Sequence, residues 1–395
     1  MRAKGHVLYI GGFEMPDKNA AAHRVVANAK LMSNLGYEIT LIGVTKNVKQ
    51  RQFISTTKKE YDGIAYYEVK YPTSIKSWMY YVTSISHIKK IAKENKVTHI
   101  IGYNYPGIAL FKLKKFSRKK SIKLLADVTE WYEAKQGSLA FKIIKKTDVF
   151  IRMKLVQPKL DGLIVISDYL QDYYKDKLKN IVNLPPLVDL SMERWNIIPQ
   201  IKEDNKEVKL IYAGSPGAGE KDRLDLIIEA LINVKKKREL AFKMNIIGLT
   251  KEQFFTSFNI KEGLVNSIDE VIVFKGRLPH DEVLREIRSA DFKVFVRDEN
   301  LTNQAGFPTK YVEAISCGTP VLTNDSSNIV NFFKEGRTGF LLNNKNAATL
   351  EESFLNIFTK ETLVKIPEMK LYCRKSKKFD ISNFRDSFNY FLNEI

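Results

Sequence analysis

Several features that mark other protein classes are missing from this chain of 395 residues. It has only two cysteines, Cys317 and Cys373, which excludes a disulfide framework and favours a reducing compartment. No stretch reaches the ~18–20 uninterrupted apolar residues that a bilayer span needs. The amino-terminus leads directly into the strand-like HVLYIGG, without the apolar region of a signal peptide. We therefore expect a cytoplasmic protein that is not integral to a membrane.

Motifs for common ligands are also missing. The glycines after the first predicted strand lack the Gly-x-Gly-x-x-Gly spacing of a dinucleotide site, and no Lys-Ser/Thr pair follows the later glycine-rich loop. No cluster of histidines and cysteines has the spacing of metal ligands. We expect neither a metal nor a cofactor.

Acidic residues are scarce in one half of the chain. Residues 1–190 contain 33 Lys/Arg and 16 Asp/Glu, whereas residues 191–395 contain 31 and 29, so nearly all of the net charge of +19 lies in the first half. A one-sided positive field attracts polyanions. The candidates are an anionic membrane surface, nucleic acid and a phosphorylated substrate.

Short apolar runs alternate with stretches of helical spacing in the first half. Strands are predicted at 6–11, 37–44, 63–70, 97–103, 122–128 and 162–167, and helices at about 20–35, 78–95 and 106–116. Apolar runs punctuated by glycine, with helices between them, are typical of a parallel, doubly wound sheet.

A linker pattern at 183–207, with paired prolines and a charged end, separates this half from a second one. Strands are then predicted at 209–214, 242–248, 271–276, 292–297, 320–324 and 339–342. We expect an α/β chain with two Rossmann-like domains, 1–188 and 189–378, facing across a cleft. An amphipathic helix at 379–395 is expected to cross back to the N-terminal domain.

In parallel sheets, ligands bind at the carboxyl ends of strands. The first such loop is GGFEMPDKNAAAHRVV (11–26), where Gly11 and Gly12 permit a close backbone approach and Asn19 can cap the next helix. This loop is either an acceptor or phosphate loop or a plain strand-to-helix turn. His23 and Arg24 are either ligand groups or part of a solvated first turn.

The second loop is YAGSPGAGEKDRLDL (212–226), with three glycines, Ser215 and Lys221 between a strand and a helix. Backbone amides and one ammonium can share the charge of a diphosphate there. Lys221 is either this phosphate clamp or a surface lysine, and Arg223 is the second candidate for the role.

The third segment begins at Arg297 and leads to a helix that we expect to start at Pro308. Gly306, Phe307 and Thr309 would present backbone amides at that helix N-terminus, which favours a phosphate. Glu313 follows on the same helix face as Thr309 and could accept hydrogen bonds from a ribose diol. The alternative for Glu313 is an ordinary surface glutamate.

AGFPTKYVEAISCGTPVLTND (305–325) and the following NFFKEGRTGFLL resemble the donor-nucleotide motif of the retaining family 4 (group 1) glycosyltransferases. The stretch GRLPHDEVLREIRSADF (276–292), which contains Arg277, and the IYAG loop fit the same pattern. In the first half, LDGLIVISDYLQDYY and LPPLVDL are similar to that family as well. The resemblance covers most of the second domain and is scattered in the first.

The resemblance implies a GT-B fold and transfer of a hexosyl or N-acetylhexosaminyl group from a nucleoside-diphosphate sugar, with UDP as the expected carrier. By position, Glu313 resembles the glutamate that binds the ribose, and Lys221 the basic residue on the diphosphate. Gly306 and Phe307 match the stretch beside the donor sugar, and the neighbouring Pro308, Thr309, Lys310, Gly214, Ser215, Arg223 and Arg277 complete the expected donor site.

This sequence departs from the family at two positions. Ala305 stands where the first glutamate of the motif is expected, and Ser215 stands where an arginine usually follows Gly214. A branch of bacterial surface-polysaccharide enzymes has a similar GFPTK variant. The second departure leaves one fewer cation for the diphosphate, which amides and lysines are expected to stabilise without a metal.

Acceptor binding is expected in the basic half. Asp127 and Glu130, in LLADVTEWYE, either orient the acceptor hydroxyl or are loop acids satisfied locally. The segments 112–123 and 139–156 mix cations with apolar residues. They either dock on an anionic leaflet that carries a lipid-diphosphate-linked saccharide, or are solvated lysines on ordinary helices.

Two other function classes stay open at the level of sequence. One is a nucleotide-sugar epimerase or a catalytically silent sugar-binding protein of the same fold. The other is a nucleic-acid-binding protein, which we do not favour because the basic segments lack a recognised signature.

Overall fold

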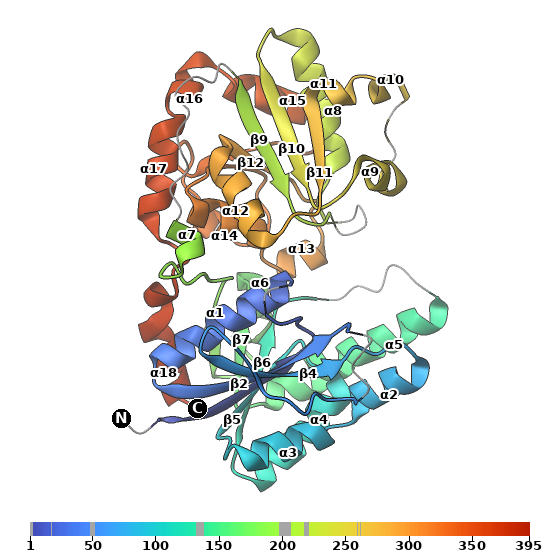
Figure 1. The fold of residues 1–395 in the computed structure, drawn as a ribbon, viewed down its shortest axis with the longest axis vertical. Coiled ribbons are helices and arrows are strands. Elements are labelled where there is room, and N and C mark those ends of the chain that lie inside the picture. The colour runs from blue at the N-terminus through green and yellow to red at the C-terminus, as the bar shows by residue number, and fades with distance from the viewer. Residues whose placement is uncertain are drawn as a thin grey trace. The chain divides into compact units, whose positions relative to one another are not determined.

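The structure is a computed structural model that describes residues 3–16, 18–47, 52–131, 138–196, 207–216, 221–258, 260 and 262–395. The chain forms two compact units (Figure 1). Unit 1 comprises Met1–Asp189, Ala305–Phe307 and Ile381–Ile395, and unit 2 comprises Leu190–Gln304 and Pro308–Asp380.

Unit 1 is built on an eight-stranded sheet of order β3-β4-β2-β1-β5-β6-β7-β8, in which β3 pairs antiparallel with β4 and the other neighbours run parallel. The strands are β1 Gly5–Gly11, β2 Tyr37–Thr45, β3 Lys59–Tyr61, β4 Ile64–Lys70, β5 His99–Tyr103, β6 Lys123–Val128, β7 Gly162–Val165 and β8 Ile181–Asn183. The short edge strands β3 and β8 are absent from the sequence prediction because they carry too few residues for a clear apolar pattern.

The helices of unit 1 cover both faces of this sheet. They are α1 Ala20–Asn34, α2 Ile75–Thr83, α3 Ser86–Glu94, α4 Gly107–Lys119, α5 Leu139–Val149, the π-helix η1 Phe150–Val156, the 3₁₀ helix η2 Gln157–Lys159, α6 Asp168–Tyr174, the 3₁₀ helix η4 Ile381–Phe384 and α18 Arg385–Asn393. Val7 and Tyr9 of β1 enter the core shared with α1 and α18, whereas Leu8 and Ile10 are buried on the opposite face. A strand buried on both faces reads as a continuous apolar run, as the sequence predicted.

The single helix predicted at 78–95 is wrong. The chain forms α2 and α3 instead, because Ser84 leaves the helical region with extended backbone angles and its hydroxyl bonds to that of Ser86. Serine side chains offer the backbone local hydrogen bonds that compete with a helix.

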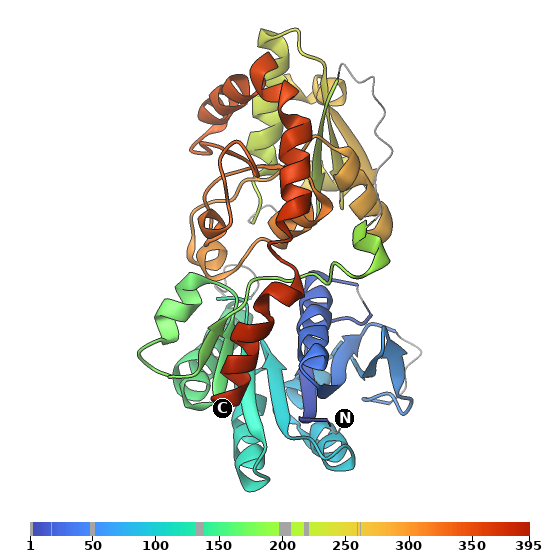
Figure 2. The same cartoon turned by 90° about the vertical axis from the view of Figure 1, so that its left-hand side faces the viewer.

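The C-terminal segment completes unit 1. Ile381 donates its amide to the Val188 carbonyl at 2.9 Å, and Phe388, Phe391 and Leu392 of α18 join the core beside α1. Figure 2 shows α18, in red, lying against the strands of this sheet next to α1. The tail is therefore a short 3₁₀ turn followed by a helix, rather than one continuous helix.

Unit 2 is a six-stranded parallel sheet of order β11-β10-β9-β12-β13-β14. Its strands are β9 Val208–Ala213, β10 Phe242–Ile247, β11 Ile272–Gly276, β12 Phe292–Val294, β13 Val321–Thr323 and β14 Gly339–Leu341. Its helices are α7 Glu193–Asn196, α8 Leu224–Lys237, α9 Lys251–Ser257, α10 Glu262–Val265, α11 Ile268–Val271, α12 His280–Ser289, α13 Leu301–Ala305, α14 Thr309–Cys317, the 3₁₀ helix η3 Ile329–Asn331, α15 Ala347–Ile357, α16 Lys360–Val364 and α17 Ile366–Ser376.

Both sheets contain a point where the strand order reverses. In unit 1 it lies between β1 and β5, and in unit 2 it lies between β9 and β12. Loops that leave the carboxyl ends of strands diverge at such a point, which is where open α/β sheets bind ligands. The loops after β9 and β12 are therefore the expected ligand-binding loops of unit 2.

Candidate active site

The loop after β9 is packed so tightly that glycine is required. Gly214 has φ +139°, and a Cβ there would lie 2.4 Å from Cε of Lys310. A Cβ on Gly248 would lie 2.3 Å from the Gly214 carbonyl oxygen. Backbone conformations with positive φ are accessible to glycine at low cost. The side chain of Lys310, from α14, therefore lies directly beneath this loop. Residues 217–220 of the loop lie outside the described residues.

A buried cluster of charges lies beneath the loop. The carboxylate of Asp222 accepts hydrogen bonds from the Arg297 Nε at 2.8 Å and from the Tyr212 hydroxyl at 2.7 Å, and it pairs with the Lys310 ammonium at 2.9 Å. Burial by itself would raise the pKa of Asp222, but the cations of Lys310 and Arg297 hold it below its ordinary value. With two cations and one anion, the cluster keeps one net positive charge at the switch point.

Lys310 connects this cluster to the loop. Its ammonium donates to the Ser215 carbonyl at 3.3 Å as well as contacting Asp222. Burial and the neighbouring Arg297 lower the pKa of Lys310, and Asp222 opposes them. An additional anion above the loop would therefore stabilise the protonated lysine.

The chain enters α14 through Gly306, Phe307 and Pro308. No side chain caps the N-terminus of this helix, whose first residue is Thr309, and it ends at Gly318 with φ +77°. The predicted helix start at Pro308 is confirmed to within one residue. Such an N-terminus carries a partial positive charge that favours an anion.

Glu313 is fixed by a lysine that the sequence prediction missed. The ammonium of Lys293, in β12, lies 3.0 Å from Oε2 of Glu313, and Nε2 of His280 lies 3.9 Å from Oε1. Lys293 is 0% exposed and Glu313 is 20% exposed. The sequence did contain a signal for this pair, namely a lysine within the apolar stretch FKVFV. An isolated buried lysine would be very costly, so a lysine in such a stretch needs an acidic partner.

The other predicted cations of the donor site differ in their surroundings. Lys221 is exposed at the end of the glycine-rich loop, and Arg277 is exposed just after β11. The guanidinium of Arg223 instead contacts Asp225 at 2.7 Å and Asp298 at 3.0 Å. Two carboxylates hold Arg223, and Lys221 and Arg223 both stay candidates for the diphosphate.

In unit 1, Asp127 differs from the expectation that it orients an acceptor. It is fully buried, pairs with the Arg24 guanidinium at 2.8 Å and accepts a hydrogen bond from the Tyr9 hydroxyl. Arg24 is equally buried, so it is neither a ligand group nor part of a solvated turn. The pair neutralises charge between α1 and β6 and leaves Asp127 out of reach of a substrate.

The remaining candidates of unit 1 lie at the carboxyl ends of its strands. Asn19 caps α1 by accepting from the Ala22 amide at 2.9 Å, as predicted. A Cβ on Gly11 would lie 2.7 Å from Cβ of Tyr103, whereas one on Gly12 would lie 3.7 Å from the Tyr81 hydroxyl, an ordinary van der Waals contact. His23 lies in the first turn of α1. Burial raises the pKa of Tyr103, and the negative charge of the half-buried Glu130 raises it further. Glu130 therefore stays a candidate for the acceptor hydroxyl.

The second half of the chain is similar in sequence to a known protein family. Residues 193–376 match the family model of glycosyl transferases group 1. No curated protein matches the chain at the level of sequence.

Solved structures resemble the chain over nearly its full length. Sucrose-phosphate synthase from Thermosynechococcus elongatus is 13% identical with a TM-score of 0.72, and the match covers 99% of each chain. Anabaena HepE in complex with UDP is 13% identical with a TM-score of 0.66, over 99% of this chain and 100% of HepE. The pneumococcal O-GlcNAc transferase GtfA, in complex with UDP and GlcNAc, is 11% identical with a TM-score of 0.61, over 99% of each chain. At such low identities the likeness establishes the fold alone. Residues 193–376 therefore have the sequence pattern of the group 1 glycosyltransferases, and the chain has the GT-B fold.

Proposed function

We propose that this chain transfers a hexosyl or N-acetylhexosaminyl group from a UDP-sugar to a saccharide acceptor, with retention of anomeric configuration. The acceptor is a lipid-linked saccharide of a cell-surface polysaccharide pathway. The observation that carries the proposal is the net positive charge of the Asp222–Arg297–Lys310 cluster under the loop after β9. The UDP complexes of HepE and GtfA support the choice of UDP.

Lys310 takes over the charge that the family's usual arginine would supply at position 215. Its ammonium lies against the Ser215 carbonyl, so it reaches the same loop from beneath. Together with Lys221, Thr309 and the amides of Gly306 and Phe307, it offers the diphosphate two cations and a helix N-terminus. Glu313, oriented by Lys293, accepts from the ribose hydroxyls.

The chemistry requires stabilisation of the leaving diphosphate. The bond from the anomeric carbon to the phosphate oxygen breaks as the acceptor oxygen bonds to that carbon on the same face. The acceptor proton passes to the departing phosphate oxygen, so no strong base is needed. Fixed cations and amides lower this barrier because they are already oriented toward the developing charge. Glu130 positions the acceptor hydroxyl.

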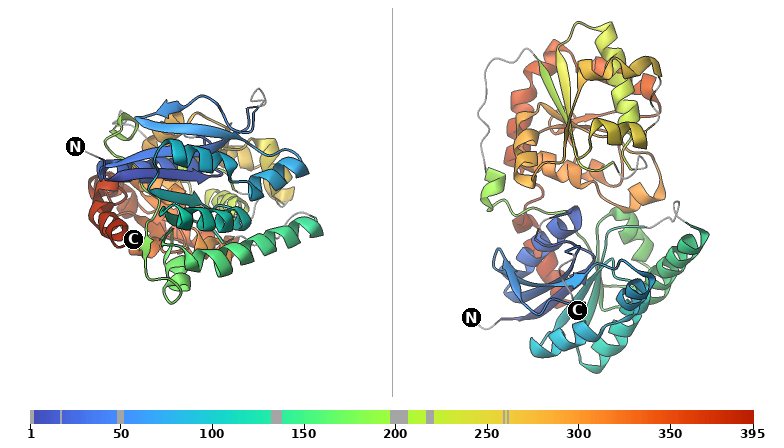
Figure 3. Two further views of the ribbon diagram at one scale, coloured as in Figure 1. Left: turned by 90° about the horizontal axis from the view of Figure 1, so that it is seen from below. Right: turned by 45° about the vertical axis from the view of Figure 1, so that its right-hand side comes forward.

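We also propose that an exposed face of unit 1 docks on an anionic leaflet. The docking face consists of the outward side chains of α2, α4 and α5, and α2 and α5 each pack against α4 (Figure 3). Its exposed apolar side chains are Ile75, Trp78, Met79, Tyr80, Ile108, Phe111, Leu139, Phe141, Ile143 and Ile144. No residue of α2 is buried, and Ile75 and Ile144 are 86% and 67% exposed.

Lysines surround these apolar side chains. Lys115 lies 4.6 Å from the ring centre of Phe111, and Lys145 lies 5.9 Å from that of Phe141. Apolar tips with adjacent cations fit a surface of anionic lipid, where each cation contributes about 1 kcal/mol. Solvated lysines on an ordinary helix would not require this apolar surface. No helix in the described residues is long and apolar enough to span a membrane, so docking would be peripheral.

A nucleotide-sugar epimerase of the same fold is the second candidate, because Ala305 replaces the carboxylate expected before the motif. The deciding experiment measures stabilisation by UDP-, GDP- and ADP-sugars, and then UDP release with and without a lipid-linked acceptor. Acceptor-dependent UDP release is expected. Formation of an epimer without acceptor would favour the second candidate, and the absence of stabilisation by any nucleotide sugar would overturn both.

A further inference from the structure

A cavity in unit 1 lies away from the candidate donor and acceptor loops and shares only α4 with the docking face. It has a volume of about 480 Å³ and is bounded by the end of α4, the start of β6 and the segment from η2 to β7. This is the amino-terminal edge of the sheet, whereas the candidate acceptor loops follow the carboxyl ends of the strands. A volume of this size is within the ordinary range for small-ligand pockets.

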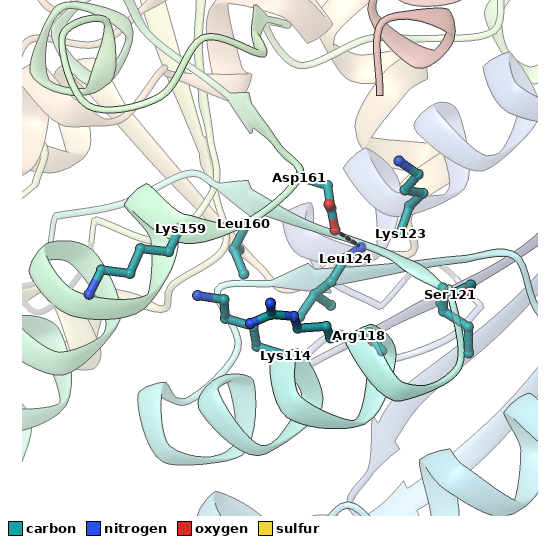
Figure 4. Close-up of a pocket in the computed structure, with 10 residues that line it drawn as sticks. Lys114, Arg118, Ser121, Lys123, Leu124, Lys159, Leu160 and Asp161 are labelled. Carbon is teal, nitrogen blue, oxygen red and sulfur yellow. Dashed lines mark hydrogen bonds between the residues drawn. The ribbon is translucent and has the colours of Figure 1, made fainter.

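Cations dominate the lining of this cavity. Lys114 and Arg118 lie side by side on α4, and Lys159 lies across from them (Figure 4). Lys123 also lines the cavity, but its ammonium donates to the backbone oxygen of the C-terminal residue, Ile395. The acidic member of the lining is Asp161, whose carboxylate accepts from the Leu124 amide at 2.7 Å.

The three remaining cations lack an internal counter-ion. Within the described residues, no carboxylate oxygen lies within 4.0 Å of the charged nitrogens of Lys114, Arg118 or Lys159. Burial and the cations of Lys159 and Arg118 lower the pKa of Lys114, and Asp161 opposes them only in part. Lys114 is half-buried and Arg118 and Lys159 are exposed, so an anion that enters the cavity would meet three cations without another charged partner.

An uncharged group gives a second, independent indication. Ser117 is also among the residues that line the cavity and is 2% exposed, and its buried hydroxyl has no hydrogen-bond partner within the described residues. Buried hydroxyls in native proteins nearly always have a partner, and an unpaired one calls for a ligand or water. A hydroxyl among three unpaired cations is suited to an oxyanion.

We propose that this cavity is a second binding site, for a phosphate group, in which Lys114, Arg118 and Lys159 neutralise the charge and Ser117 donates a hydrogen bond. Three cations against Asp161 leave a charge that matches a dianionic phosphate. The group belongs either to a free phosphorylated compound or to a lipid head group. The site goes beyond the proposed transfer reaction and does not depend on it.

The test uses the full chain saturated with UDP, so that the donor site does not compete for the probe. Inorganic phosphate and pyrophosphate are titrated calorimetrically at constant ionic strength, and vesicles containing phosphatidic acid are compared with neutral vesicles. The pocket variant is Lys114→Ala/Arg118→Ala. The matched control is Lys236→Ala/Lys345→Ala, which removes two exposed cations of unit 2 that line neither the cavity nor the docking face.

The pocket variant should weaken binding of at least one probe by tenfold or more, and the control should change it less than about twofold. Ser117→Ala should weaken binding about three- to tenfold without loss of thermal stability, because it removes an unpaired buried hydroxyl. Pocket-dependent binding of the soluble anions identifies a free phosphate, and pocket-dependent binding of vesicles alone identifies a head group. Equal losses in the pocket and control variants, or no saturable binding of either probe, would overturn the proposal.

Discussion

Charged residues in the interior distinguish this chain at the scale of single residues. Arg24 with Asp127, Lys293 with Glu313, and the cluster at Asp222 each pair charges that the core would not accept alone. The first pair joins α1 to β6 in unit 1. In unit 2, the second joins β12 to α14, and the cluster lies beneath the loop that follows β9. The residue-scale predictions concern these two.

Lys310→Met tests the cation beneath the loop while keeping a side chain of similar length against Gly214. We expect kcat/KM for the UDP-sugar to fall about 10- to 100-fold, because one charge-assisted contact to the diphosphate is lost. Lys360→Met, on an exposed residue of unit 2, is the control and should leave kcat/KM unchanged. Unchanged kcat/KM in a folded Lys310→Met protein would remove Lys310 from the donor site.

Removing either partner of the Lys293–Glu313 pair should lower the free energy of unfolding, but by different amounts. Glu313→Ala leaves Lys293 as an unpaired cation at 0% exposure and should destabilise the protein by about 3 kcal/mol. Lys293→Met removes the buried charge and leaves the partly exposed glutamate to water, so its cost should be smaller. Denaturant unfolding of both variants measures the difference. Equal destabilisation, or a larger cost for Lys293→Met, would contradict the assignment of Lys293 as the buried member.

At the scale of elements, some helices of unit 1 bury one face, whereas others leave an apolar face uncovered. The amphipathic helix α3 buries His87, Ile88, Ile91 and Ala92, whereas α2, next to it in the chain, buries none of its residues. Both helices are short and carry apolar residues, so composition alone does not account for their difference.

His87 gives a pH-dependent test of the packing of α3. Burial lowers the pKa of His87 from 6.5 to about 4. Below pH 6.5 the unfolded chain binds a proton that the folded protein excludes, so stability is complete above that pH and falls as the pH approaches 4. The loss should reach about 3 kcal/mol. His87→Phe, which keeps a ring beside Phe53, should lack this part of the pH dependence in unfolding experiments between pH 7 and pH 4. Identical pH profiles for the two proteins would contradict the burial of His87.

The exposed apolar side chains of α2 and α5 should anchor the docking face to anionic vesicles. Ile75→Glu/Ile144→Glu should weaken sedimentation with anionic vesicles by at least about tenfold, because two apolar anchors become charged. Val364→Glu/Leu371→Glu alters exposed apolar residues of unit 2 in the same way and should leave vesicle binding unchanged. If both double variants weaken binding alike, the docking face is misassigned.

At the scale of the whole molecule, charge and chemistry divide between the two halves. Residues 1–190 carry nearly all of the excess positive charge, whereas the candidate donor residues lie in the other half, from Gly214 to Glu313. Association with a charged surface and binding of the nucleotide should therefore respond differently to salt.

Raising the salt concentration from 50 to 500 mM (about a threefold drop in Debye length) should strongly reduce binding to anionic vesicles. UDP binding, measured in the absence of vesicles, should change much less, because its contacts are short and partly buried. Sugar transfer to a vesicle-borne acceptor should follow vesicle binding. Parallel loss of vesicle and UDP binding would argue against separate roles for the two halves.

The sequence by itself determined the two α/β halves, most of the strands and the helix that starts after Pro308. These features depend on local patterns, namely apolar runs, glycine punctuation and cap residues, that act over a few positions. It also predicted a donor motif that contains Glu313, a separate loop with Lys221, and the similarity to the group 1 glycosyltransferases that residues 193–376 share.

Only the tertiary structure decided which charged residues are partners. Asp127 was expected either to orient the acceptor or to be satisfied locally, and it is bound to Arg24, 103 positions away in the chain. Lys293 was not recognised although it holds Glu313. The same holds for the phosphate cavity, whose cations come from separate segments, and for the uncovered face of α2. Burial and pairing depend on contacts between distant segments, which no local pattern records.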